Sequence, residues 1–392
     1  FFLRIRRPPR STLFPNTTLF RSTTRPEPEV KTTVRVSHTD ANADFYTLQG
    51  AVDFFTRNAV EGEKTIMLDE GKFEEIVNIR NLSNLTVKGA GADKTEIQSD
   101  NNNNWNPGIK DGCDSGLADA LKPGMDIPYV DGRNQGGGRA GVLIAGKADK
   151  IRFEDVGMRC LYPTKTQAEV LCIRNKSDNA TAFVRCRFYS QQDTLLPGGG
   201  YNWFYDCYVE GDTDFIWGGN SACLFERCEV EMITSGGRGF NARVKANNIG
   251  YVFSECSLTV AEGVTKCRLL EGSDGTGMVD NITFVNTTID KEFFSGGINS
   301  EDKSMVPIAG YDDNIIRYNK NKDEIGELGE DTGIKDGCKM YDCTYDDGKS
   351  VQESGVYGAD RIHTLTLEEY NRYFKDRSTV LGGYADTTWF TE

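Results

Sequence analysis

A six-residue pattern, Phe-x-x-Cys-x-apolar, recurs along the middle of the chain and restricts the folds that the chain can adopt. Full copies begin at Phe183, Phe204, Phe225 and Phe253, and weaker copies at Phe153 and Phe284. Successive copies start 30, 21, 21, 28 and 31 residues apart, so the pattern is kept while the connections vary, which is typical of a solenoid. Alternate apolar residues have the period of a strand with one buried face. We therefore predict an all-β fold, a right-handed parallel β-helix with short capping helices and long surface loops.

Two aspartates occupy the same place relative to this pattern. Asp193 lies ten residues after Phe183, and Asp214 lies ten residues after Phe204. In stacked coils, equivalent positions are one strand spacing apart, about 4.8 Å, so the two carboxylates should be neighbours. Like charges that close raise the pKa of one carboxyl and lower that of the other. One aspartate would then serve as an acid and the other as a nucleophile or base.

Other functions for these aspartates remain open on spacing alone. A single aspartate at a corner of a β-helix would more simply cap backbone groups in a turn. Here Gln192 and Thr213 share the same register and predict a polar column on one outer face, which favours a site. Two carboxylates about 5 Å apart would also suit a retaining glycoside hydrolase, and the register cannot separate the two chemistries.

Longer motifs around both aspartates resemble those of a known family. Gln192-Asp193-Thr194-Leu195 matches the QDTL signature of the pectin methylesterases (carbohydrate esterase family 8), and Asp214–Gly218 matches their DFIWG signature. The 21-residue gap between the signature aspartates is also that of the family. The resemblance runs from about residue 32 to about residue 390, with further similar segments at Gly71–Glu75, Asn84–Ile97, Gln167–Leu171 and Leu365–Tyr370.

The resemblance implies a role for each residue of the motifs. Asp214 would attack the methyl ester of a galacturonate unit of pectin as a nucleophile, and Asp193 would act as general acid and then as general base. Gln167 and Gln192 would donate amide hydrogens to the oxyanion, which favours ester chemistry over an oxocarbenium ion. Trp217 would offer an apolar surface to a sugar, although a core aromatic explains it equally well. The expected protein is a secreted monomer that binds pectin and needs no cofactor or metal.

One family segment is missing from the sequence. The family carries Leu-Gly-Arg-Pro-Trp, whose arginine pairs with the nucleophile, but the corresponding stretch Cys267–Thr276 lacks Arg-Pro-Trp. Arg268 is the arginine of that stretch and is our candidate for the partner, with Arg243 as the second choice. A non-catalytic, carbohydrate-binding relative is the alternative that this difference leaves open.

Composition narrows the possible classes of function. Residues 1–22 resemble the translated read-through of a sequencing adaptor, so we assign the domain to residues 32–390 and expect the native N-terminus, with any export signal, to lie outside this sequence. Removing those residues takes away five arginines and no acid, so the formal charge changes from −14 to −19 (−14 − 5). Such an acidic chain is a poor ligand for nucleic acid or an anionic membrane, and no run of 18 apolar residues could span a bilayer.

Histidine and cysteine use exclude further chemistries. The two histidines, His38 and His363, and the missing Gly-x-Ser-x-Gly motif make a Ser-His-Asp esterase improbable. No paired Cys-x-x-Cys motif indicates a zinc site. Eleven cysteines cannot all pair, and those of the repeat predict an inward ladder of buried thiols, whereas Cys338 and Cys343 are the best candidates for a disulfide.

Segments outside the repeat predict the ends and the loops of the solenoid. Asp100–Arg139 and the stretch from Phe294 to about Asp347 interrupt the coils and are expected to be long loops that line a binding cleft. Tyr46–Arg57 has helical spacing and should cap the open end of the stack. Leu367–Phe374 should form a short helix that packs back on the coils.

Overall fold

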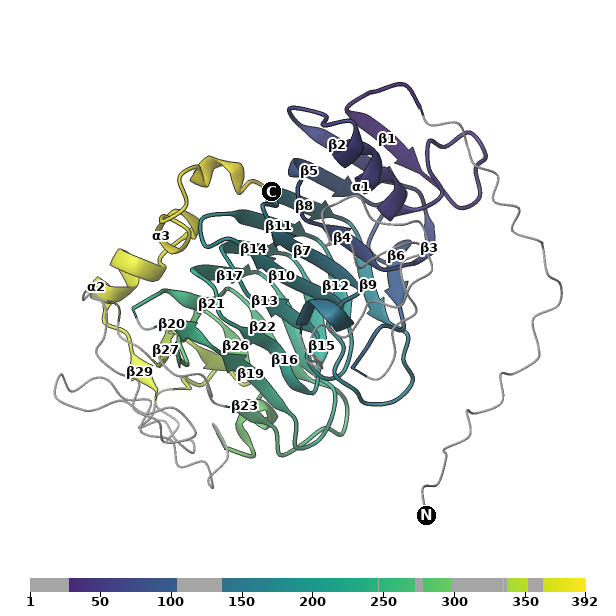
Figure 1. Ribbon diagram of the computed structural model, residues 1–392. Helices are drawn as coiled ribbons and strands as arrows, with labels where there is room; N and C mark the ends of the chain where they lie inside the picture. The colour runs from purple at the N-terminus through teal and green to yellow at the C-terminus, as the bar shows by residue number, and fades with distance from the viewer. Residues whose placement is uncertain are drawn as a thin grey trace, which may run out of the picture.

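The computed structural model is a right-handed parallel β-helix whose coils pass in turn through three sheets, A, B and C (Figure 1). It describes residues 28–103, 136–245, 247–271, 278–297, 334, 337–351 and 362–392. The predicted adaptor-derived segment, residues 1–22, lies outside this range, as does most of both predicted loops. Among the described residues, every pairing within the three sheets is parallel, and no helix is both long and apolar enough to span a membrane.

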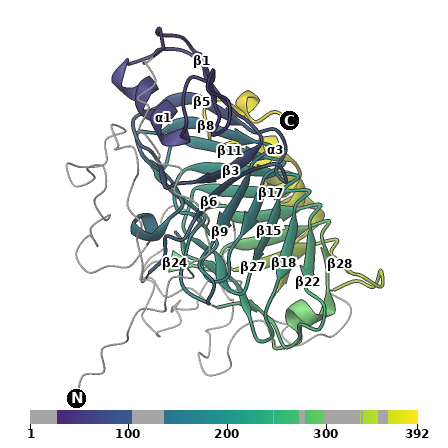
Figure 2. The same cartoon turned by 90° about the vertical axis from the view of Figure 1, so that its right-hand side faces the viewer.

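The three sheets run the length of the stack, and Figure 2 shows sheet B in series. Sheet A contains, in spatial order, β1 (Thr33–Val36), β2 (Lys64–Leu68), β5 (Ser83–Lys88), β8 (Asp149–Glu154), β11 (Ala180–Val184), β14 (Tyr201–Tyr205), β17 (Ala222–Glu226), β21 (Gly250–Ser254), β25 (Ile282–Val285), β27 (Cys338–Tyr341) and β29 (His363–Thr364). Sheet B contains β3 (Gly71–Glu74), β6 (Thr95–Ser99), β9 (Gly157–Cys160), β12 (Arg187–Tyr189), β15 (Tyr208–Gly211), β18 (Glu229–Met232), β22 (Ser257–Val260), β26 (Thr288–Ile289) and β28 (Thr344–Tyr345). Sheet C contains β4 (Val77–Ile79), β7 (Val142–Gly146), β10 (Leu171–Asn175), β13 (Leu195–Pro197), β16 (Thr213–Gly218), β19 (Arg238–Ala242) and β23 (Arg268–Leu270). A short antiparallel pair, β20 (Val244–Lys245) and β24 (Met278–Val279), lies outside these sheets.

The phenylalanines of the repeat form one stack in the core, as the pattern predicted. Register pairs Phe153, Phe183, Phe204, Phe225, Phe253 and Phe284 on successive strands of sheet A. The rings of Phe183 and Phe204 lie 4.8 Å apart, and those of Phe204 and Phe225 lie 4.5 Å apart with their planes at 7°. Because each ring contacts the ring of the next coil, the pattern fixes which strands pair.

The cysteines of the repeat follow a sharp corner between sheets A and B. The residue before each cysteine has a left-handed backbone, with φ between 51° and 56° at Arg185, Asp206, Arg227 and Glu255. This corner turns the next side chain inward, where the thiol donates to a backbone carbonyl of the neighbouring coil, as Cys207 does to Phe183 O at 3.4 Å. The predicted ladder of buried free thiols is confirmed for Cys186, Cys207, Cys228 and Cys256.

The predicted Cys338–Cys343 disulfide is wrong, and so is the prediction that these two residues lie in a loop. Both thiols are buried and free. Residues 338–345 form β27 and β28 of a further coil, with Met340 in register with Phe284. Met340-x-x-Cys343-x-Tyr345 is therefore another copy of the repeat, in which methionine replaces phenylalanine.

Helices close the first end of the stack and cover part of sheet A. The predicted N-terminal cap is confirmed as α1 (Leu48–Arg57), with Thr47 accepting a hydrogen bond from Gly50 N as its N-cap. Its apolar side chains, including Phe54 and Phe55, join the core. Short helical segments occur elsewhere at η2 (Gly136–Arg139), η3 (Lys291–Phe294), α2 (Leu367–Glu369), η5 (Tyr370–Phe374), α3 (Arg377–Val380) and η6 (Thr387–Trp389).

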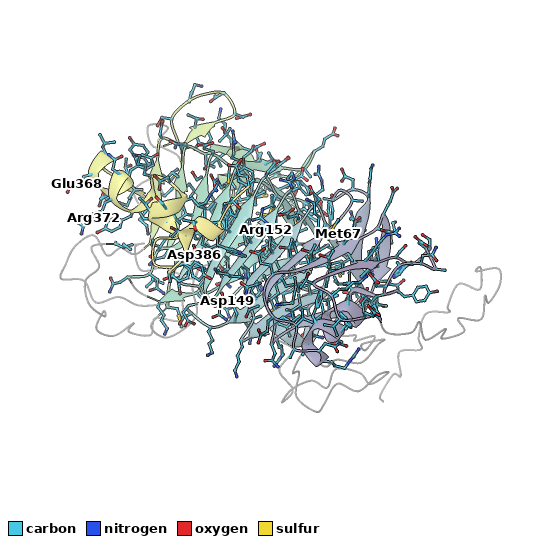
Figure 3. All side chains as sticks on the ribbon, turned by 90° about the horizontal axis from the view of Figure 1, so that it is seen from above. Met67, Asp149, Arg152, Glu368, Arg372 and Asp386 are labelled. Atoms are coloured by element: carbon cyan, nitrogen blue, oxygen red, sulfur yellow. The ribbon has the colours of Figure 1, made fainter. Side chains whose placement is uncertain are left out.

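The C-terminal segment packs along sheet A, as predicted for Leu367–Phe374. Phe374 is buried in one cluster with Trp203 of β14. Arg377 binds Glu226 of β17 at 2.9 Å, and Asp386 binds Lys150 of β8 at 2.7 Å. Figure 3 shows Asp386 on the yellow segment over the strands that carry Asp149 and Arg152.

Phe204→Ala should destabilise the fold strongly because Phe204 is fully buried between two other rings of the stack. We expect a loss of about 3–5 kcal/mol in the free energy of unfolding, measured by chemical denaturation. Glu229→Ala, an exposed change on the neighbouring sheet B, is the control and should alter stability by less than about 0.5 kcal/mol. Equal stability of the two variants would contradict the central role of the phenylalanine stack.

Candidate active site

The predicted polar column lies where the chain turns from sheet B into sheet C. Parallel bridges pair Gln167 with Gln192 and Gln192 with Thr213, one residue per coil. All three side chains are half-buried at the outer surface. The next strands continue the register through Arg238 and Arg268. The register that was predicted for Gln192 and Thr213 is therefore confirmed, and Gln167 joins them.

Asp193 and Asp214 lie on adjacent coils in equivalent positions. Leu195 pairs with Ile216, and Asp193 N donates to Thr213 O at 3.0 Å, which fixes the register between the two aspartates. Both have a left-handed backbone, with φ of 67° at Asp193 and 50° at Asp214, a conformation that aspartate tolerates better than most residues. The two aspartates therefore share both backbone conformation and register at the same corner of the stack.

A buried ion pair that the sequence analysis did not identify contacts this site. Arg139, at the end of η2, donates from Nε to both carboxylate oxygens of Glu169 at 2.9 and 2.8 Å, and from Nη2 to Asp193 Oδ2. The side chains of Arg139 and Glu169 are 3 % and 0 % exposed. A signal for Glu169 was present in the sequence, because it places a charged residue among the apolar residues that precede β10.

An extra residue in the chain accommodates Glu169. Gln167 pairs with a residue 25 positions later, whereas Leu171 pairs with one 24 positions later, so the segment from Gln167 to Leu171 has one more residue than its equivalent from Gln192 to Leu195. Such a bulge re-aims a side chain next to a regular strand. Glu169 therefore reaches Arg139 while Leu171 keeps its place in the core.

The surroundings of Asp193 favour its protonated form. Burial raises the pKa of Asp193 to about 8, repulsion from Glu169 and Asp214 adds to this effect, and Arg139 and Arg243 oppose it. At neutral pH Asp193 is thus a carboxylic acid that can give up a proton. Burial also raises the pKa of the nearby Cys172 to about 12, so this thiol is not poised as a nucleophile.

Trp217, the predicted sugar-stacking residue, is only 6 % exposed. It lies in a small apolar cluster with Cys172 and Leu196 on sheet C. Two guanidinium groups lie near its ring, that of Arg139 at 5.7 Å and that of Arg243 at 5.1 Å from the centroid. These contacts favour a role in packing the two arginines beside the carboxylates, and sugar stacking stays a prediction.

The two candidate partners of the nucleophile are placed differently. Arg268 lies two coils beyond Asp214, and its Nε donates to Gly296 O at 3.2 Å. Arg243 follows β19 on the next coil, and its charge acts on Asp193. Arg243 is therefore nearer to Asp214 along the stack than Arg268 is, Arg139 contacts Asp193, and the partner of Asp214 stays a prediction.

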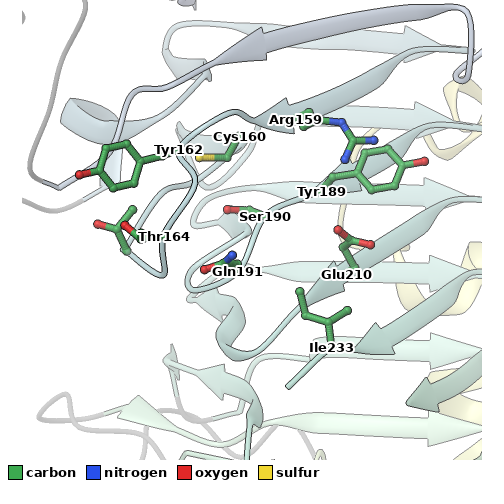
Figure 4. A pocket seen from close by; sticks show the side chains of 10 residues that line it. Arg159, Cys160, Tyr162, Thr164, Tyr189, Ser190, Gln191, Glu210 and Ile233 are labelled. Atoms are coloured by element: carbon green, nitrogen blue, oxygen red, sulfur yellow. The ribbon is translucent and has the colours of Figure 1, made fainter. Parts of the chain in front are cut away.

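A pocket of about 200 Å³ opens beside the polar column on the side of sheet B (Figure 4). Figure 4 shows Gln191 between the loop that carries Tyr162 and Thr164 and the strands that carry Tyr189 and Glu210. Arg159 stacks on Tyr189, with its guanidinium carbon 3.8 Å from the ring centroid. Hydroxyl, amide and carboxylate groups of this kind can hydrogen-bond a polar ligand in this pocket.

Comparisons with known proteins agree with these features. Residues 140–268 match the family model described as Pectinesterase. Probable pectinesterase 8 from Arabidopsis thaliana is 29 % identical over 230 residues, which are 55 % of this chain and 51 % of that protein. The chain thus spans about half the length of this curated relative.

Solved structures show the same fold at low sequence identity. Pectin methylesterase PemA from Erwinia chrysanthemi has a TM-score of 0.59 and 18 % identity, covering 91 % of this chain and 99 % of that one. A pectin methylesterase in complex with a hexasaccharide has a TM-score of 0.58 and 17 % identity, with the same coverage. Residues 140–268 are thus similar to the pectinesterase family, and the solved structures share the right-handed parallel β-helix fold of this chain.

Proposed function

We propose that this protein is a pectin methylesterase, a carboxylic ester hydrolase that removes methyl groups from methyl-esterified galacturonate units of pectin. The observation that carries the proposal is the pair of aspartates, Asp193 and Asp214, in register on adjacent coils and beside the amides of Gln167 and Gln192. Ester hydrolysis by carboxylates needs one group that attacks, one that carries a proton, and donors for the oxyanion. The pair and its neighbours supply all three.

In the first half of the reaction, an oxygen of Asp214 attacks the ester carbonyl carbon. The carbonyl oxygen becomes an oxyanion, which the amides of Gln167 and Gln192 stabilise by roughly 3 kcal/mol per donor. The bond from the carbonyl carbon to the methoxy oxygen then breaks, and Asp193 gives its proton to that oxygen. Methanol leaves, and the galacturonate stays bound to Asp214 as an acyl-enzyme.

In the second half, water releases the acid. Asp193, now a carboxylate, takes a proton from the water as the water oxygen attacks the acyl carbon. The bond to Asp214 breaks, which restores both aspartates and leaves a free galacturonate carboxyl. The acidity of the whole chain favours stretches of pectin that are still esterified and therefore neutral. We place the enzyme outside the cell, where pectin occurs, and expect it to act as a monomer.

The decisive test is incubation with highly methylated pectin, with methanol and new reducing ends measured in parallel. Methanol without new reducing ends supports the esterase. A glycoside hydrolase stays a second candidate because one strand spacing between carboxylates also suits a retaining mechanism, and it would produce new reducing ends. Retained pectin binding without either product, unchanged by Asp214→Ala, would instead identify a carbohydrate-binding relative.

Activity should fall as the pH rises through about 8. The acid form of Asp193 is needed for methanol to leave, and its pKa is raised to about 8, so kcat/KM is expected to be lost above that value. This fall on the alkaline side of the pH profile, the alkaline limb, is measured from initial rates of methanol release between pH 5 and pH 10. An enzyme-free blank corrects for alkaline hydrolysis of the ester. A rate that keeps rising to pH 10 after subtraction of the blank would show that Asp193 is not the acid.

A further inference from the structure

A single buried arginine serves two carboxylates at the candidate site. Arg139 contacts Glu169 through Nε and Asp193 through Nη2. The side chains of all three residues are at most 4 % exposed. The reaction described above uses Asp193 but assigns nothing to Arg139 or Glu169.

Charge counting limits how these groups ionise. With Arg139 positive, ionisation of both carboxylates would leave an uncompensated negative charge in a site that excludes water. Taken by themselves, these three side chains are neutral only if one of the two carboxylates is protonated. Other groups also act on these residues, including the cations Arg174 and Arg243, the thiol of Cys172 and the carboxylate of Asp214, so charge balance alone does not assign the proton and the contacts must decide.

The arrangement of the contacts determines which carboxylate holds the proton. Both carboxylate oxygens of Glu169 accept a hydrogen bond from Arg139 Nε, whereas Asp193 accepts one from Arg139 Nη2 through a single oxygen. Asp193 also faces Asp214 on the next coil, whose charge opposes ionisation. Burial raises the pKa of Glu169 as well as that of Asp193, but the two contacts from Nε and the charge of Asp214 favour the anion on Glu169 and the proton on Asp193.

We propose that Glu169 is a positioning residue. Its carboxylate neutralises the guanidinium of Arg139 and thereby keeps the candidate acid, Asp193, protonated. This inference rests on the function proposed above. Arg139 is suited to the task because its planar fork presents donors to both carboxylates at once, which the single ammonium of a lysine cannot do. Without the anion of Glu169, Arg139 would stabilise the ionised form of Asp193 instead.

Glu169→Gln tests this proposal because it removes one charge and keeps the shape of the side chain. The alkaline limb of kcat/KM for methanol release should move to lower pH by roughly 1–3 units, as expected for an acid next to an unopposed guanidinium. Glu169→Asp keeps the charge and should restore the limb toward its wild-type position. Glu226→Gln, which removes the same charge from the Arg377–Glu226 pair on sheet A, is the matched control and should leave the limb in place.

A second measurement does not depend on turnover. Carbon-13 NMR of protein labelled at the aspartate carboxyls follows Asp193 directly, once its signal is assigned by its loss in Asp193→Asn. The midpoint of that signal should lie near 8 in the wild type and fall in Glu169→Gln in step with the alkaline limb. This titration decides the question even if Glu169→Gln folds poorly, because a wild-type midpoint near the ordinary value of 3.8 would overturn the proposal.

The outcomes separate this inference from the proposed function. Absence of methanol release by the wild-type protein would contradict the proposed function. The NMR titration would still report the protonation of Asp193 beside Arg139 and Glu169. Methanol release with the same alkaline limb in the wild type and in folded Glu169→Gln overturns the role of Glu169 and leaves the esterase intact. A limb that moves in Glu169→Gln and returns in Glu169→Asp supports both.

Discussion

Asp214→Asn is expected to lower methanol release from methyl-esterified pectin on the order of 10⁴-fold or more, with little change in thermal stability. An amide cannot form the acyl-enzyme, so the variant loses the covalent route rather than one stabilising contact. Asparagine has nearly the shape of aspartate and also tolerates the left-handed backbone at this position, where φ is 50°. The fold should therefore be kept, and the loss should appear in kcat at saturating pectin.

A matched control is available at another corner of the same coils. Asp206 also has a left-handed backbone, with φ of 51°, but lies between sheets A and B, away from the polar column. Asp206→Asn should unfold at the wild-type temperature and release methanol at the wild-type rate. If Asp214→Asn kept most of its activity under the same conditions, Asp214 could not be the nucleophile.

The sequence was sufficient to predict the coils and the aspartate pair because both depend on local repetition. A parallel β-helix places residue i above its equivalent on the next coil, so the spacing of Phe183 and Phe204 transfers directly to Asp193 and Asp214. The repeat did not reveal one further coil, because a substitution changes the pattern there. Met340 fills the place of a phenylalanine, and its coil was therefore mistaken for a loop.

The electrostatics of the site could not be predicted in the same way. Arg139 lies 30 residues before Glu169 and 54 before Asp193, outside any repeat, and only the folded chain brings the three together. The partner of Asp214 is open for the same reason: the sequence pointed to Arg268, whereas register places that residue two coils from Asp214. Pattern fixes positions along the stack, but the segments between strands determine which charges meet.

The structure suggests how the site can work without the Arg-Pro-Trp segment. Arg139 and Arg243 still supply positive charge. Arg139 comes from a coil before the two aspartates and Arg243 from the coil after them, and both guanidinium groups lie near the ring of Trp217. Arg139 comes with its own counter-ion, Glu169, so under this proposal it holds Asp193 in place without stabilising the ionised form of that carboxyl. In the proposed mechanism, Arg139 would serve the acid, Asp193, and Arg243 on the next coil would be the cation nearer to the nucleophile, Asp214.

Asp193→Asn should reduce methanol release by about 10²- to 10⁴-fold, the usual contribution of general acid–base catalysis. Asparagine can accept the hydrogen bond from Arg139 but cannot give a proton to the departing methoxy oxygen. The residual rate should also lose its alkaline limb near pH 8, because the group that titrates there is gone. Methanol release measured from pH 5 to pH 10 tests both the size and the shape of the effect.

Stability gives an independent check on the protonation of Asp193. Its pKa in the folded protein, about 8, lies above the ordinary value of 3.8, so between these values the unfolded chain releases a proton that the folded protein retains. Folding of the wild type is therefore penalised progressively as the pH rises from about 4 to about 8, whereas Asp193→Asn is not. The variant should gain stability relative to the wild type across that range in denaturant titrations. A constant difference between the two proteins from pH 4 to pH 8 would mean that Asp193 is ionised in the folded protein and cannot be the acid that releases methanol.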